Sequence, residues 1–334
     1  MTSVPGTAEL PASTVDPAGL EPVAEYVTGL QTTNVLRAAD GTYRWWQRPG
    51  PLAGEPPTAT PFPSRLPDAP GAARLALPRP TGDGLLYQVP GPASAAAWLR
   101  DFRPAARLLV ASALASVARG LRALHRSGPP APERSGPPPA LLRLRSWAAS
   151  DDESRGRAEE LWGRRRTVRL LDWADEAAGT TATAGAELPA GPVHGWASLG
   201  ALVPPLRAGR TALLTGPDLG TGRPELDLGW TLGELAELHW RLPSLHTTPD
   251  PNRAPSSPPA LARVFLDAYG PGPDPVLLGR CAVLRIAVHL QDFARHQGWH
   301  DELLDYFAFT ADLIDQEGRP ALPPELGDHH HDPA

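Results

Sequence analysis

The stretch Val193–Leu238 reads VHGWASLGALVPPLRAGRTALLTGPDLGTGRPELDLGWTLGELAEL. Its apolar runs predict a pair of strands at Leu199–Val203 and Thr211–Leu214. Glycine and proline then crowd the segment Gly216–Pro224, which is typical of a turn. An apolar helix is expected to follow, beginning near Asp227. The stretch therefore predicts two strands, a turn and a helix in succession.

This frame resembles the active-site region of the aminoglycoside phosphotransferases and their choline-kinase-like relatives. The residues that keep the spacing of that family's motifs are His194, Gly195, Gly220, Gly222, Pro224, Asp227 and Leu228. Each short piece alone is weak evidence, but the shared spacing over most of the stretch is fairly specific. The resemblance implies a protein-kinase-like α+β fold with two lobes, a reduced β-rich small lobe and a mostly helical large lobe.

The residues that carry the family's chemistry are missing from this frame. The position of the catalytic aspartate holds Trp196, and the two magnesium-ligand positions hold Ala201 and Thr215. An indole, a methyl group and a hydroxyl thus replace a base and two metal ligands. Because phosphoryl transfer depends on a positioned base and on magnesium over the phosphates, the resemblance implies a catalytically degenerate member, a pseudokinase.

The N-terminal part shows a similar loss. The turn Ala39-Asp40-Gly41 separates two β-rich runs and predicts a hairpin. Thr33-Asn34 and Arg48-Pro49 match the family's small-lobe hairpin, while Gln47 occupies the position of its phosphate-binding lysine. Prolines throughout residues 50–73 exclude the helix that in the family carries the lysine's glutamate partner. On this segment alone, an unrelated hairpin that ends in Gln-Arg-Pro is the alternative.

The composition narrows the possible functions. All 31 basic residues are arginine, so the chain has no lysine to hold phosphates. The net charge of −6 argues against nucleic acid as the main partner. The single cysteine, Cys281, excludes an internal disulfide and a cysteine-based zinc site. Neither a signal peptide nor an apolar run of membrane-spanning length is found, so a cytoplasmic protein without a membrane partner is expected.

Proline-rich blocks and apolar periodicity predict the organisation of the chain. The expected parts are a disordered arm at 1–20, a small β-rich lobe at 21–90, a helical large lobe at 91–320 with a proline-rich insertion at 127–190, and a polar tail at 321–334. Helices are predicted at Ala105–His125, near Leu141–Trp147 and Arg155–Ala178, and at Pro259–Tyr269, Pro275–Gln297 and His300–Gln316, and further strands at Leu75–Pro80 and Leu85–Val89.

Asp227 and His125 lie at predicted helix ends close to the matched motifs. The resemblance implies that Asp227 braces the backbone of the former catalytic loop. As a residue at the start of a helix, Asp227 also fits an N-terminal cap. His125, at the end of the helix Ala105–His125, is interpreted as a side chain near the negative end of the helix dipole rather than as a ligand.

Three functions remain open. The first is a non-catalytic pseudokinase that binds a partner protein or peptide without a cofactor, as degenerate relatives do in natural-product biosynthesis. The second is an active phosphotransferase on a small molecule or peptide, with Asp218 as a relocated acid and with ATP and magnesium. The third is a plain structural protein. The family's catalytic and ligand residues are independently replaced at Gln47, Trp196, Ala201 and Thr215, which favours the first function and argues against an enzyme. The oligomeric state is left open.

Trp196 is predicted to fill the space that magnesium and the γ-phosphate occupy in the family. We expect it to be at least half buried against large-lobe residues, with its N–H bonded to backbone or to the turn Thr215–Asp218. A ligand would then lie farther out, toward Gln88–Gly91 or across the insertion. The alternative is a shifted loop that places Trp196 in the ordinary core and leaves the cleft open.

Overall fold

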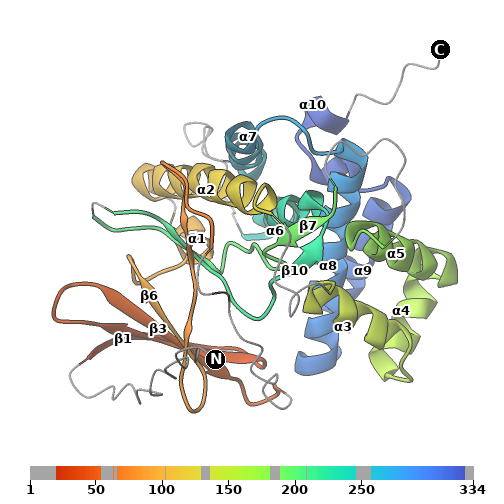
Figure 1. Ribbon diagram of the computed structural model, residues 1–334. Helices are drawn as coiled ribbons and strands as arrows, with labels where there is room; N and C mark the ends of the chain where they lie inside the picture. The colour runs from red at the N-terminus through yellow and green to blue at the C-terminus, as the bar shows by residue number, and fades with distance from the viewer. Residues whose placement is uncertain are drawn as a thin grey trace, which may run out of the picture.

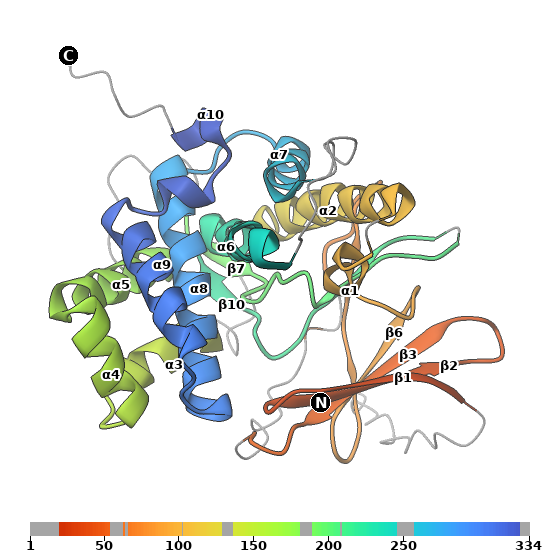
Figure 2. The same cartoon turned by 180° about the vertical axis from the view of Figure 1, so that it is seen from behind.

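The computed structural model describes residues 20–53, 63, 66–101, 103–128, 136–180, 189–207, 209–245 and 257–327. They form a small lobe built on an antiparallel sheet and a larger lobe made mostly of helices (Figure 1; Figure 2 shows the opposite side). This is the two-lobed α+β architecture expected from the sequence. Apart from its last residue, the arm predicted at 1–20 lies outside the described residues.

The small lobe is a five-stranded sheet in the order β1-β2-β3-β6-β5. Its strands are β1 Glu21–Val27, β2 Gln31–Arg37, β3 Tyr43–Pro49, β5 Arg79–Pro80 and β6 Leu85–Val89. The predicted hairpin is confirmed, since β2 and β3 pair along their whole lengths. Asp40 fixes its turn because Oδ1 accepts the N–H of Thr42 at 2.9 Å, as aspartate does in many turns.

One face of this sheet, the inner face, packs on the large lobe. Val35, Trp45 and Tyr87 are direct neighbours across β2, β3 and β6, and all three are buried. Since side chains alternate between the faces along a strand, Gln47 belongs to the same face as Trp45. The apolar cluster continues into the large lobe through Ala212. The two lobes therefore share a core across their junction.

A three-stranded sheet also ties the lobes together. β4 Arg74–Ala76 runs parallel to β9 Ala212–Leu214, which pairs antiparallel with β8 Leu202–Val203. The strand pair expected in Val193–Leu238 is thus confirmed, although both strands are shorter. The pairing of β4 with β9 was not predicted, because parallel pairing of distant segments leaves no local signal in the sequence.

The large lobe consists mainly of helices close to their predicted positions. They are α1 Ala95–Leu99, α2 Pro104–His125, α6 Pro224–Leu245, α7 Pro258–Tyr269, α8 Pro275–Gln297 and α9 Glu302–Asp315. A short helix α10, Pro324–Gly327, lies within the range expected to be a polar tail. α6 and α8 pack closely because a Cβ at Gly233 would lie 2.4 Å from the carbonyl oxygen of Ala282.

Within the insertion at 127–190, the described residues 136–180 form helices that pack on the side of the large lobe (Figure 1). They are α3 Pro139–Ala148, α4 Glu153–Trp162 and α5 Arg164–Ala177. One or two helices were expected near Leu141–Trp147 and Arg155–Ala178, but the described residues form three, because the second range is not continuous. It breaks at Gly163, whose φ of +77° lies in the left-handed region that ends α4.

The long helix α2 is apolar enough to cross a membrane by length and composition alone. Its residues Val110, Leu114 and Leu121 are buried in the core of the large lobe. One face of α2 is therefore part of the core of the large lobe. The cytoplasmic location stays a prediction.

Candidate functional site

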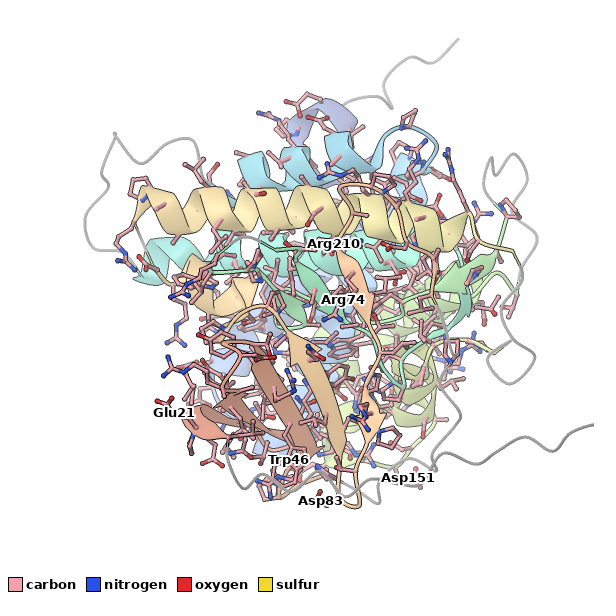
Figure 3. The ribbon with its side chains drawn as sticks, turned by 60° about the vertical axis from the view of Figure 1, so that its left-hand side comes forward. Glu21, Trp46, Arg74, Asp83, Asp151 and Arg210 are labelled. Atoms are coloured by element: carbon pink, nitrogen blue, oxygen red, sulfur yellow. The ribbon has the colours of Figure 1, made fainter. Side chains whose placement is uncertain are left out.

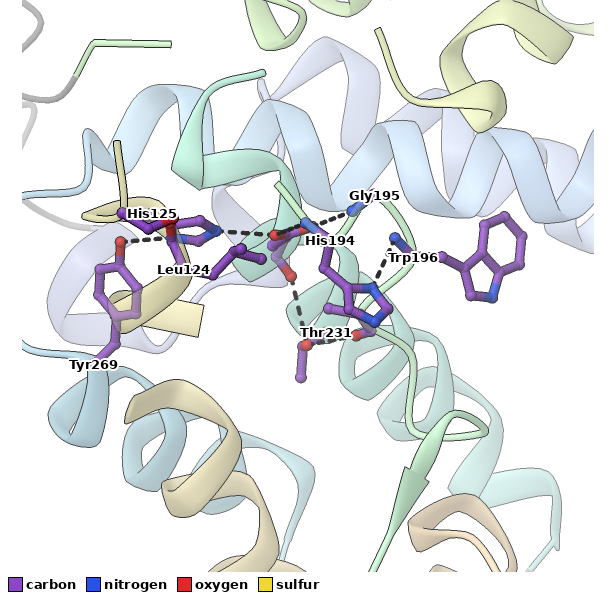
Figure 4. A network of polar contacts seen from close by, with 10 residues as sticks. Leu124, His125, His194, Gly195, Trp196, Thr231 and Tyr269 are labelled. Carbon is purple, nitrogen blue, oxygen red and sulfur yellow. Dashed lines mark hydrogen bonds and ion pairs between the residues drawn. The ribbon is translucent and has the colours of Figure 1, made fainter. Parts of the chain in front are cut away.

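The candidate site is built around the 194–201 loop, which follows β7. β7 Gly191–Val193 pairs with β10 Gly220–Gly222 and so brings the loop beside the start of α6. In Asp227, Oδ2 accepts the N–H of His194 at 2.6 Å and Oδ1 accepts the N–H of Gly195 at 2.7 Å (Figure 4). The predicted brace is therefore present. The cap interpretation is wrong, because α6 already begins at Pro224 and the carboxylate bonds the loop.

A buried histidine extends this brace. His125, at the end of α2, places Nε2 2.9 Å from Oδ2 of Asp227 and Nδ1 2.9 Å from the hydroxyl of Tyr269 in α7 (Figure 4). The side chain of His125 is only 2% exposed, so its role goes beyond the expected contact with a helix dipole. One carboxylate thus links α2, α6 and α7 to the loop. Sequence reasoning missed Tyr269 because these residues lie far apart in the chain.

The charges of this network follow from burial and hydrogen bonding. Burial alone would raise the pKa of Asp227, but the hydrogen bond and charge of His125 hold that pKa below its usual value. The ionised carboxylate only accepts hydrogen bonds, so His125 donates from Nε2. Burial lowers the pKa of His194 and keeps its ring neutral. Its Nε2 donates to the carbonyl of Leu214 at 3.0 Å, and its Nδ1 accepts the N–H of Trp196 at 3.3 Å.

Two further side chains of α6 hold the rest of the loop. The hydroxyl of Thr231 donates to the carbonyl of Ala197 at 2.7 Å, and Glu234 accepts the N–H of Leu199 at 2.7 Å. Asp227, Thr231 and Glu234 follow at spacings of four and three residues, which places them on one face of the helix. Polar residues at this spacing within an apolar helix are a sequence signal of a buried polar face, and Thr231 and Glu234 could have been predicted from it.

Gly195 allows the loop to pass close to the turn between β9 and β10. Its φ of +78° lies in the left-handed region. A Cβ at this position would also lie 2.0 Å from the carbonyl oxygen of Asp218. Both the conformation and the close approach therefore require glycine, as the match to the family implied.

Trp196 fills the position that the resemblance assigns to the catalytic aspartate. It is partly buried, and its ring centre lies 4.9 Å from that of Trp230 in α6. The guanidinium of Arg143 in α3 lies 5.3 Å from the same ring. This packing on large-lobe residues agrees with the expectation. Figure 4 shows the indole directed away from the Asp227 network. The bond expected from the indole N–H to backbone or to the turn Thr215–Asp218 stays a prediction.

Thr215 and Ala201, at the positions of the family's magnesium ligands, both form hydrogen bonds with backbone groups. Thr215 is fully buried, and its hydroxyl donates to the carbonyl of Leu213 at 3.0 Å. The carbonyl of Ala201 accepts the N–H of Leu214 at 2.8 Å. Neither side chain offers the carboxylate or amide oxygen that magnesium prefers. Within the described ranges, no group of three or more His, Cys, Asp or Glu side chains is placed to hold a metal ion.

The remaining predicted residues lie on either side of the lobe junction. Asp218, the possible relocated acid, is half-buried in the turn before β10. Burial raises the pKa of Tyr87, and the charge of Asp218 raises it further. The same charge opposes the effect of burial on His194. Gln47 lies on β3, so a neutral amide stands at the lysine position of the inner face.

Comparison with known proteins gives the fold a precedent. No protein-family model and no curated protein matches the sequence. Among solved structures, an amicoumacin kinase in complex with AMP-PNP and Ca²⁺ superposes with a TM-score of 0.50 at 15% identity, over 93% of this chain and 91% of that chain. An ethanolamine kinase from Plasmodium vivax gives a TM-score of 0.49 at 10% identity, over 91% of this chain and 84% of that chain.

A putative aminoglycoside phosphotransferase from Ralstonia eutropha gives a TM-score of 0.47 at 13% identity, over 90% of this chain and 92% of that chain. At sequence identities this low, a structural similarity establishes the fold alone. The conclusion rests on the amicoumacin kinase, which has a TM-score of 0.50. The chain has the kinase-like fold of the amicoumacin kinase. The resemblance seen in the sequence is confirmed at this level.

Proposed function

We propose that this chain is a pseudokinase that binds a partner protein or peptide and transfers no phosphate. The observation that carries the proposal is the contrast within one loop. Asp227 holds the loop backbone as a braced scaffold, while Trp196, Ala201 and Thr215 offer neither a base nor a magnesium ligand. Such a scaffold suits binding, but it leaves phosphoryl transfer without its reactive groups.

The physical argument is electrostatic. In phosphoryl transfer the protein mainly positions the reactants and stabilises developing charge. A methyl group at Ala201 cannot coordinate magnesium, and the hydroxyl of Thr215 is already bonded to Leu213. Gln47 brings no charge, and the chain contains no lysine that could replace it. The losses affect both lobes, so a single neighbouring side chain cannot compensate for all of them.

The filled inner face of the small-lobe sheet supports the same proposal. In protein kinases a lysine of the third strand reaches the nucleotide phosphates. Here Trp45, on the face that Gln47 shares, is 4% exposed and donates its indole N–H to the carbonyl of Gly91 at 3.1 Å. Across the junction, a Cβ at Gly216 would lie 2.9 Å from the hydroxyl of Tyr87. Trp45 and Tyr87 are thus packed against large-lobe backbone on the face that Gln47 shares.

One observation favours a second candidate, an active but divergent phosphotransferase. Asp218 follows β9 closely, and its charge acts on both His194 and Tyr87. A carboxylate therefore lies near the loop, three residues after the former magnesium position at Thr215. This candidate requires ATP and magnesium, and the lysine position on β3 still holds the neutral Gln47.

We also propose that the protein acts in the cytoplasm, beside a second protein on a peptide of natural-product biosynthesis. The support is the analogy with degenerate relatives and the lack of a base and of magnesium ligands at Trp196, Ala201 and Thr215.

Isothermal titration calorimetry with magnesium-ATP tests the proposed function. We expect no binding tighter than about 1 mM, because the phosphate and metal positions are neutral. Asp218→Asn is the matched variant. Micromolar, magnesium-dependent binding by the wild type would overturn the pseudokinase proposal. If Asp218→Asn then abolished that binding, the second candidate would replace it.

A further inference from the structure

The small-lobe sheet ends on an edge at β1. In the order β1-β2-β3-β6-β5, this strand has β2 as its sole neighbour among the described residues. Half of the backbone N–H and C=O groups of an edge strand point away from the sheet and can pair with another strand. Figure 3 shows Glu21, the first residue of β1, at the margin of the sheet, with Trp46 of β3 farther in.

Apolar side chains are concentrated along this edge. Val23, Tyr26 and Val27 of β1 and Leu30 in the next turn are all exposed, and Val27 reaches 61%. Tyr26 lies on the inner face, where its ring centre is 6.5 Å from that of Trp45. Because side chains alternate, Val27 lies on the opposite face. An added strand would therefore find apolar contacts on both faces of the sheet.

The apolar strip continues past the end of β1. Leu52 is 48% exposed, and a Cβ at Gly29 would lie 2.9 Å from Cδ1 of Leu52. The same Cβ would lie 2.8 Å from the side chain of Gln297, at the end of α8. The turn after β1 thus lies against the end of α8 in the large lobe.

The first half of β1 is protected against pairing. Pro22 has no N–H to donate, and the register with β2 shifts between Pro22 and Ala24. Proline and bulges are common devices that prevent edge strands from pairing with one another. The second half, Ala24–Val27, carries neither device. The open part of the edge is therefore short and well defined.

The charges of β1 decide between two kinds of occupant. The strand carries Glu21 and Glu25 and no basic residue, and both carboxylates are exposed. Glu21 pairs with Arg37, and Glu25 accepts a hydrogen bond from Asn34 at 2.9 Å. A second copy of β1 would bring two further carboxylates to this edge, which is unfavourable in cross-strand pairs. A strand with basic side chains would complement it.

We propose that Ala24–Val27 binds an extended segment of a partner protein in which apolar and basic residues alternate, by addition of a strand to the sheet. The inference rests on the proposed binding function and names the surface that performs it. Main-chain hydrogen bonds along β1 provide affinity. The exposed apolar residues and the carboxylate of Glu25 select the sequence of the segment.

Fluorescence anisotropy with defined peptides tests this proposal. The probe is a labelled nonapeptide of alternating arginine and valine, compared with a peptide that has glutamate for arginine and with one N-methylated at alternate backbone nitrogens. We expect the first peptide to bind at least tenfold more tightly than either of the others. Val27→Lys should weaken its binding at least tenfold. Leu108→Lys, which adds the same charge at a 72% exposed site on α2, should not.

The possible outcomes separate this inference from the proposed function. Equal binding of the N-methylated peptide, or equal effects of the two lysine variants, would overturn strand addition at β1. A dimer seen by sedimentation and abolished by Val27→Lys would also overturn it, because a second copy would then be the occupant. Neither result depends on magnesium-ATP. Nucleotide binding by a protein that passes the peptide test would instead overturn the pseudokinase alone.

Discussion

At the scale of single residues, Asp227 concentrates several contacts on one buried carboxylate. It accepts two backbone N–H groups of the loop and one imidazole N–H, and it is fully buried. Asp227→Asn would turn one acceptor into a donor that faces existing donors. We expect the free energy of unfolding to fall by about 2–4 kcal/mol, measured by urea denaturation.

The control for this variant is Asp267→Asn on the exposed face of α7. A surface change of this kind should alter stability by less than about 0.5 kcal/mol. If Asp227→Asn destabilised the protein no more than Asp267→Asn, the carboxylate would not be the brace that its hydrogen bonds suggest.

His194 predicts a pH dependence of stability. Because burial lowers its pKa in the folded protein, the unfolded chain takes up a proton first as the pH falls below about 6.5. The free energy of unfolding should then fall by up to about 1.4 kcal/mol per pH unit from this group. His194→Gln does not titrate and should show a shallower slope between pH 6.5 and 5 in urea titrations. Equal slopes would contradict a neutral, buried His194.

At the scale of elements, the break between α4 and α5 depends on the conformation of one residue. Gly163 has a φ of +77°, and a Cβ added there would meet nothing within 4 Å. Gly163→Ala should therefore destabilise the protein by about 1 kcal/mol through backbone strain alone. Gly156→Ala, inside α4 and equally unobstructed, should stabilise it by about 0.5–1 kcal/mol.

Thermal denaturation of the two variants checks this pair. The melting temperatures are expected to move in opposite directions, although both substitutions add the same methyl group. A higher melting temperature for Gly163→Ala would contradict the backbone strain expected at this break.

At the scale of the whole molecule, catalysis would need groups from both lobes at once. Trp196→Asp restores one carboxylate, but a general base contributes about 10²–10⁴-fold only when phosphate and metal are already held. We therefore expect no ATP turnover above background in a coupled assay. Circular dichroism of the same variant checks that it is folded, because the substitution also removes the contact with Trp230. Turnover by this variant would show that another metal site exists and would favour the second candidate.

The sequence by itself determined the features that depend on local chemistry. The turn at Asp40, the strand pair after the 194–201 loop and the helix Pro275–Gln297 follow from turn residues and from apolar periodicity. The motif spacing around His194 and Asp227 was enough to identify the kinase-like fold. All of these signals lie within short windows of the chain, where neighbours in sequence are neighbours in space.

The tertiary structure alone decided the contacts between distant segments. The pairing of β4 with β9, the link from His125 through Asp227 to Tyr269, and the bond from Trp45 to Gly91 join residues with no common pattern in the sequence. Their partners were set by how helices and sheets pack, because buried polar groups bond to whichever groups the fold brings within reach.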